Sequence, residues 1–142
     1  MIVLDTNVVS ELMRREPARP VLRFVSVHAA ASLFTTTVTQ AEIRYGLMLL
    51  PHGRRREALE AAASGMFAED FAERVLPFDG AAADAYAAVA AERRRAGRPI
   101  AVLDAQIAAI VRSRDATLAT RNASDFEGCG IDVVNPWTGV AR

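Results

Sequence analysis

Short apolar segments alternate with longer helical patterns along the whole chain, and this alternation limits the folds it can adopt. The first apolar run, Ile2-Val3-Leu4, contains no polar residue, which is typical of a strand covered on both faces. The predicted strands lie at 2–4, 32–36, 75–76, 117–120 and 131–134. Predicted helices lie between them, at 8–13, 21–27, 39–50, 55–67, 81–95 and 101–114. We therefore expect a single domain over residues 1–142, a three-layer α/β/α sandwich around a mostly parallel sheet.

The composition excludes several classes of protein. Apolar residues make up 51% of the 142 positions and charged residues 24%, as in ordinary globular chains. No apolar run reaches the roughly 18 residues that cross a bilayer, and the N-terminus lacks the basic segment of a signal peptide. We therefore expect a cytoplasmic protein that does not associate with membranes.

The ionisable side chains narrow the chemistry further. All 17 positive charges are arginine, which excludes phosphate sites that need a lysine, such as the Walker P-loop. Cys129 is the only cysteine and the chain has two histidines, so a typical zinc site is excluded as well.

Acidic residues fall where parallel strands are predicted to end. Asp5 follows the first strand, Glu42 lies just after the second, and Asp125 follows the strand at 117–120. Asp104 lies near the start of a predicted helix, on the flank of an apolar stripe. Ligands bind outside the carboxyl ends of the strands in open parallel sheets, so these acids are candidates for a common site.

Each acid also has a local explanation. Asp5 could be a helix N-cap, and Thr39 with Glu42 fits a capping box. Asp125 could serve a polar turn, and Asp104 could be a first-turn acid that interacts with the helix dipole. Four such coincidences at one end of one sheet are less probable than a shared role, so the group favours a site.

Electrostatics indicates what a shared role would be. Two carboxylates about 4.5 Å apart repel by about 3–4 kcal/mol at an effective dielectric constant of 20, so converging acids need a cation. Oxygen ligands without histidine or cysteine favour Mg²⁺ or Mn²⁺. These ions bind phosphate oxygens and activate water, which predicts phosphodiester hydrolysis.

Five segments together resemble the PIN-domain nucleases, and within them the VapC and FitB-like toxins. Four of the segments each contain one of the acids, and the fifth resembles the closing segment of this subgroup. In chain order they are Leu4-Asp5-Thr6-Asn7-Val8, Thr39-Gln40-Ala41-Glu42-Ile43-Arg44-Tyr45-Gly46, Leu103-Asp104-Ala105-Gln106-Ile107-Ala108-Ala109, Ala119-Thr120-Arg121-Asn122 with Asp125-Phe126, and Asn135-Pro136-Trp137. The order and spacing match over nearly the whole chain.

The resemblance implies an endoribonuclease whose acids hold Mg²⁺ or Mn²⁺. The implied ligands and catalytic residues are Asp5, Glu42, Asp104 and Asp125. The residues implied to orient these carboxylates and a metal-bound water are Thr6, Asn7, Thr39, Thr120 and Asn122. The implied partners are RNA, a second copy of the chain in a homodimer, and a small DNA-binding antitoxin. The antitoxin would join the toxin in a larger complex and carry it to promoter DNA.

Some assignments stay open at this stage. Arg54, Arg55 and Arg56 could contact the RNA backbone or form a solvated helix end, and the same alternatives apply to residues 93–95 with Arg98. Trp137 is interpreted as a core or dimer contact. Two other functions remain possible, a catalytically weak domain that binds and regulates an antitoxin, and a DNA nuclease with the same metal chemistry.

Overall fold

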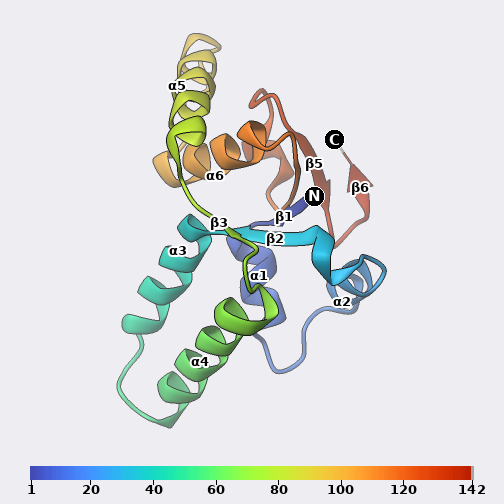
Figure 1. Ribbon diagram of the computed structural model, residues 1–142, viewed down its shortest axis with the longest axis vertical. Coiled ribbons are helices and arrows are strands. Elements are labelled where there is room, and N and C mark those ends of the chain that lie inside the picture. Colours follow the sequence, from blue (N-terminus) through green and yellow to red (C-terminus); the bar gives the residue numbers. More distant parts are fainter. Residues whose placement is uncertain (142) are drawn as a thin grey trace.

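A six-stranded sheet runs through the computed structural model, which describes residues 1–141 (Figure 1). The strand order is β3-β2-β1-β4-β5-β6. The strands are β1 (Ile2–Leu4), β2 (Leu33–Thr36), β3 (Val75–Leu76), β4 (Thr117–Ala119), β5 (Asp132–Asn135) and β6 (Val140–Ala141). The pairings from β3 through β5 are parallel, and only β6 pairs antiparallel, with β5.

Strand β1 lies at the centre of the sheet because it has no polar face. It pairs with β2 on one side, where Val3 lies opposite Phe34, and with β4 on the other, where Val3 lies opposite Leu118. After β1 the chain therefore builds β2 and β3 toward one edge of the sheet, and it later returns to add β4 on the other side of β1. Such a switch in strand order leaves a crevice at the carboxyl ends of the strands, where ligands bind in open α/β sheets.

Helices cover both faces of the sheet, which confirms the predicted α/β/α sandwich (Figure 1). The helices are α1 (Thr6–Leu12), α2 (Arg19–Ser26), α3 (Thr37–Met48), α4 (Arg54–Gly65), α5 (Gly80–Arg95) and α6 (Val102–Ser113). Helices α5 and α6 lie on one side of the sheet, and α1, α3 and α4 lie on the other. Val3 contributes to the core beneath α6, and Leu4 to the core beneath α1. None of the described helices has both the length and the apolar character that a membrane crossing requires.

Helix α3 begins two residues before the predicted position. The hydroxyl of Thr36, at the end of β2, accepts a hydrogen bond from the backbone N–H of Thr39 (3.0 Å) and caps the helix. The strand and the helix therefore follow each other without a loop, and the first turn of α3 stands at the carboxyl end of the sheet.

Two further segments differ from the sequence prediction. The helix predicted at 55–67 ends as α4 at Gly65, and a π-helical turn, η2 (Met66–Asp70), continues the chain. Strand β6 was not predicted, because its two residues are too few to show an alternating pattern. A turn between Asn135 and Gly139, where the glycine has a φ of +71°, brings β6 back against β5.

Candidate active site

Asp5 lies at the centre of the carboxyl edge of the sheet. Its backbone N–H donates to the carbonyl of Ala119 (2.9 Å), so the β1–β4 ladder continues up to this residue. Its carboxylate caps α1 by accepting from the N–H of Thr6 (2.8 Å). It also accepts from the hydroxyl of Thr120 (2.7 Å) and the side-chain amide of Asn7 (3.3 Å). The N-cap interpretation of Asp5 is confirmed, and the other two donors show that capping does not account for its whole environment.

Burial gives the Asp5 carboxylate an unusual acidity. The residue is only 5% exposed, and this desolvation raises its pKa from 3.8 to about 6. The hydrogen bonds from Thr120 and Thr6 oppose the rise, whereas the negative charges of Asp104 and Glu42 add to it. Asp5 therefore lies within electrostatic range of two other candidate ligands.

Glu42 faces the site from the second turn of α3. Its Oε1 atom accepts a hydrogen bond from the hydroxyl of Thr6 (2.9 Å), and that hydroxyl lies 3.0 Å from the hydroxyl of Thr39. Thr36 is the N-cap of α3, so the capping-box alternative for Thr39 and Glu42 is wrong. Both residues instead point toward the start of α1.

Asp104 and Asp125 approach the edge from the opposite layer. Asp104 is half-buried in the first turn of α6, and its pKa is raised by burial and by the charges of Asp125 and Glu42. Asp125 is exposed on a short 3₁₀ turn, η3 (Ala123–Phe126). The charges of the other predicted acids thus act on Asp5 and Asp104. Within residues 1–141, however, no three acidic, histidine or cysteine side chains are already placed to hold a metal ion together.

The residues predicted to orient the acids form a continuous network. The hydroxyl of Thr120 accepts from the amide of Asn7 (3.1 Å) and from the backbone N–H of Asn122 (3.1 Å). With the Thr6–Glu42 and Thr6–Thr39 contacts, four of the five predicted side chains join the network. Asn122 joins it through its backbone rather than its side chain.

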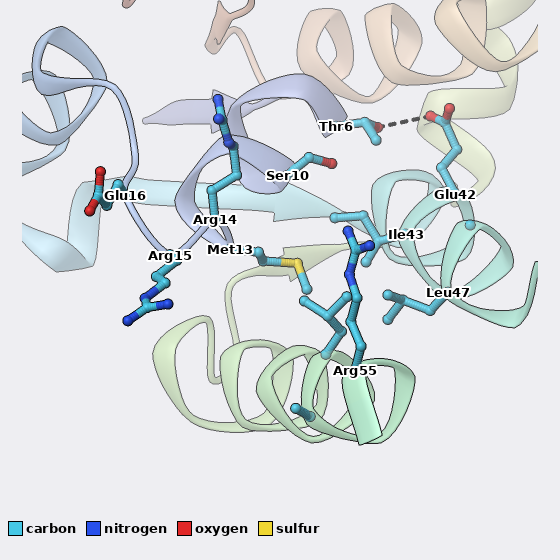
Figure 2. Close-up of a pocket in the computed structure, with 13 residues that line it drawn as sticks. Thr6, Ser10, Met13, Arg14, Arg15, Glu16, Glu42, Ile43, Leu47 and Arg55 are labelled. Atoms are coloured by element: carbon cyan, nitrogen blue, oxygen red, sulfur yellow. Dashed lines mark hydrogen bonds between the residues drawn. The ribbon is translucent and has the colours of Figure 1, made fainter. Parts of the chain in front are cut away.

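The three arginines at the start of α4, Arg54, Arg55 and Arg56, lie in different environments. Arg55 lines a groove of about 1040 Å³ together with Thr6 and Glu42. Figure 2 shows the hydrogen-bonded pair Thr6–Glu42 at one end of this groove and Arg55 reaching into it from α4. Arg56 is instead tied to Glu60 by an ion pair (2.8 Å), and Arg54 is exposed. Only Arg55 of the three therefore lies in a groove that adjoins the acids.

Sequence reasoning missed the role of Arg93, which is buried and not part of a solvated helix end. Its guanidinium donates to the backbone carbonyls of Arg98 (2.7 Å), Asp125 (2.7 Å) and Glu127 (3.0 Å). Its positive charge opposes the rise in the pKa of Asp104. Arg93 therefore holds the turn that carries Asp125. The signal in the sequence was a run of three consecutive arginines on one helix, since such residues point in different directions around the helix axis.

Comparison with known proteins gives one consistent result. The family described as PIN domain matches residues 2–127. The chain is 43% identical to the plasmid stability protein StbB of Pseudomonas syringae pv. tomato, over 96% of this chain and 99% of that protein. It is 41% identical to VapC ribonuclease Y4jK of Sinorhizobium fredii (96% and 98%) and 34% identical to toxin FitB of Neisseria gonorrhoeae (96% and 99%). The crystal structure of FitAcB from the latter organism superimposes with a TM-score of 0.90, at 34% identity and with 96% and 99% of the two chains covered.

Proposed function

Because this chain belongs to the PIN-domain family and is related to VapC ribonucleases and toxin FitB, we propose that it is a divalent-metal-dependent endoribonuclease and the toxin of a toxin–antitoxin pair. One observation carries the proposal. Asp5 is a buried carboxylate whose charge is disfavoured by its surroundings and by two neighbouring acids. A divalent cation is the simplest partner that would make such a group stable in its ionised form at neutral pH.

The donor set fits a hard cation. Asp5, Glu42, Asp104 and Asp125 would hold the ion, and all of them offer carboxylate oxygens, which favours Mg²⁺ or Mn²⁺. Small carboxylate movements would complete the coordination, since Glu42 and Asp104 are only half-buried and Asp125 is exposed.

A bound divalent ion would supply Lewis-acid chemistry, which stabilises charge on phosphoryl oxygens and makes water easier to deprotonate. The side chains of this chain fix the geometry. Thr120 and Asn7 hold one oxygen of Asp5 in place, and Thr6 fixes the orientation of Glu42. Arg93 sets the position of the Asp125 turn through the backbone.

We also infer the partners of the toxin from the family relationship. A small DNA-binding antitoxin would inhibit the enzyme, and a homodimer of this chain would join the antitoxin in a larger complex that reaches promoter DNA through the antitoxin. RNA is the proposed substrate, and the cytoplasm is the proposed location.

The test compares the wild-type chain with Asp5→Asn and Asp104→Asn on single-stranded RNA and on DNA of the same sequence. Asp84→Asn, an exposed acid on α5, is the matched control. We expect RNA cleavage with Mg²⁺ or Mn²⁺ by the wild type and by Asp84→Asn, and losses of about a hundredfold or more in the two site variants. Circular dichroism of each variant confirms that it is folded.

The alternative functions predict different results. Preferential cleavage of the DNA would indicate a DNA nuclease. An absence of metal-dependent cleavage by partner-free wild-type protein would favour the regulatory alternative. Equal cleavage by the wild type and both site variants would refute the assignment of the acids.

A further inference from the structure

The backbone of Arg121 lies beside the acidic site, and its guanidinium lies on an indole ring. Arg121 lies over the ring of Trp137, with its Cζ atom 4.9 Å from the ring centroid. The indole is partly buried against the core that contains Leu4 and Ala119, whereas Arg121 is exposed. The indole of Trp137 thus supports the positively charged guanidinium of Arg121 at the protein surface.

Hydrogen bonds fix this stack relative to Asp5. The backbone N–H of Arg121 donates to Oδ1 of Asn7 (3.1 Å), and the amide of the same asparagine donates to Asp5 (3.3 Å). On the other side, Asn135 donates to the carbonyl of Arg121 (3.3 Å) and accepts from the backbone N–H of Trp137 (2.9 Å). A single chain of contacts therefore joins the candidate catalytic carboxylate to the indole, and these contacts fix the backbone of Arg121.

The charges near the site leave a role for this arginine. Four acids repel the phosphates on either side of a bond to be cut, so a substrate strand needs a cation close by. Arg55 lines the groove on the Glu42 side of the site, and Arg93 is buried with its guanidinium donating to backbone carbonyls, so neither supplies a cation on the Asn7 side. Arg121 is exposed, and within residues 1–141 no ion pair with a carboxylate involves it.

The first turn of α1 gives the two sides of the site different surroundings. Thr6 faces Glu42 and the groove that Arg55 lines. The next residue, Asn7, faces Thr120 and Arg121. A strand that enters along the groove and crosses the acids would therefore leave past Arg121.

We propose that Arg121, supported by Trp137, binds a backbone phosphate of single-stranded RNA next to the phosphate that is cut. This inference rests on the proposed nuclease function and adds a positioning contact that does not read the base. A guanidinium held on an aromatic ring loses little conformational freedom when it binds a phosphate, which makes this a better site than a free surface arginine.

The experiment measures binding of a fluorescein-labelled single-stranded RNA by anisotropy, over a series of salt concentrations and without divalent metal. All proteins carry Asp104→Asn, which prevents cleavage and keeps the substrate intact. Arg121→Ala is compared with Arg121→Lys and with Arg114→Ala. Arg114 follows α6 at the opposite edge of the sheet and pairs with Asp79, so its removal changes the net charge equally without touching the site.

The phosphate contact predicts a specific pattern. Arg121→Ala should raise the Kd roughly tenfold and lower the slope of log K against log salt by about 0.7, the value for one phosphate contact to a single strand. Arg121→Lys should keep the slope, because it keeps the charge, and Arg114→Ala should match the parent protein. Emission of Trp137, the only tryptophan of the chain, should change as RNA saturates the parent protein.

Other outcomes overturn the proposal. An unchanged slope in Arg121→Ala would show that the stack only anchors the end of β5. Equal effects of Arg121→Ala and Arg114→Ala would show general charge attraction. The proposal also fails if the parent protein does not bind RNA. Because no cleavage is scored, failure of the nuclease proposal remains a separate result.

Discussion

Replacing Asp5 by asparagine should stabilise the metal-free protein at neutral pH, although it removes a residue that the proposed function needs. Burial raises the pKa of Asp5 from 3.8 to about 6. At about 1.4 kcal/mol for each tenfold change in the acidity constant, this rise lowers the free energy of unfolding by about 3 kcal/mol once the carboxylate is ionised. Asparagine accepts hydrogen bonds at one atom only, so the Thr120 hydroxyl and the Asn7 amide, which donate to the same oxygen of Asp5, lose their acceptor at about 1 kcal/mol each. The net gain in the free energy of unfolding is about 1 kcal/mol.

The sign of the effect depends on pH. An acid whose pKa is higher in the folded protein keeps its proton there after the unfolded chain has lost it, so the free energy of unfolding falls as the pH rises from about 4 through about 6. Below about pH 4 the carboxyl group is protonated in both states, and only the cost of the lost hydrogen bonds remains. Asp5→Asn should therefore be less stable than the wild type in acid and more stable above about pH 6.

Urea unfolding in the presence of EDTA, followed by the fluorescence of Trp137, measures the free energy of unfolding of both proteins at a series of pH values. The expected result is a crossing of the two stability curves between acid and neutral pH. Asp84→Asn, which changes an exposed carboxylate, should show no comparable crossing. A difference between Asp5→Asn and the wild type that stays constant across the pH range would refute the link between burial of this carboxylate and stability.

Three further predictions concern the same edge of the sheet. Mn²⁺ at a hundredfold excess over its Kd should stabilise the wild type by about 2.7 kcal/mol, and an undiminished rise in Tm for Asp104→Asn would contradict a shared site. Arg93→Ala should lower the free energy of unfolding by about 2–4 kcal/mol, because it removes a hydrogen-bond donor from three backbone carbonyls, and it should speed labelling of the buried thiol of Cys129. Arg93→Lys should recover part of both effects. Thr6→Val should reduce RNA cleavage by about 10–100-fold, because Glu42 loses its hydroxyl donor, whereas Thr6→Ser should keep most of the activity.

The order of strands and helices could be predicted from the sequence because apolar runs and helical patterns are local signals. The start of α3 could not, since hydroxyl residues stand at 35, 36, 37 and 39 and each is a possible cap. Packing of β2 against its neighbours decides between them. Thr35 donates to the carbonyl of Leu4 (3.0 Å), and Thr36 is left at the strand end as the cap.

The grouping of the acids could be predicted from strand ends, because the topology of a parallel sheet brings those ends together. The environment of each acid could not. The partners of Asp5 include Thr120, which is 115 positions away, and the partner of Glu42 is Thr6, 36 positions away. Arg93 shows the same limit, since its inward orientation depends on carbonyl groups of a turn more than 30 residues further along the chain.

The bond between Asp5 and Thr120 spans most of the polypeptide, and this has a consequence for synthesis in the cell. A ribosome produces the first of these residues at the outset and the second near the end, and domains fold only as their parts emerge. Any product that terminates before position 120 lacks the hydroxyl that orients the first acid. Under the proposed function, an incomplete translation product would therefore lack an ordered first acid, and full nuclease activity would arise only when nearly the whole message has been read.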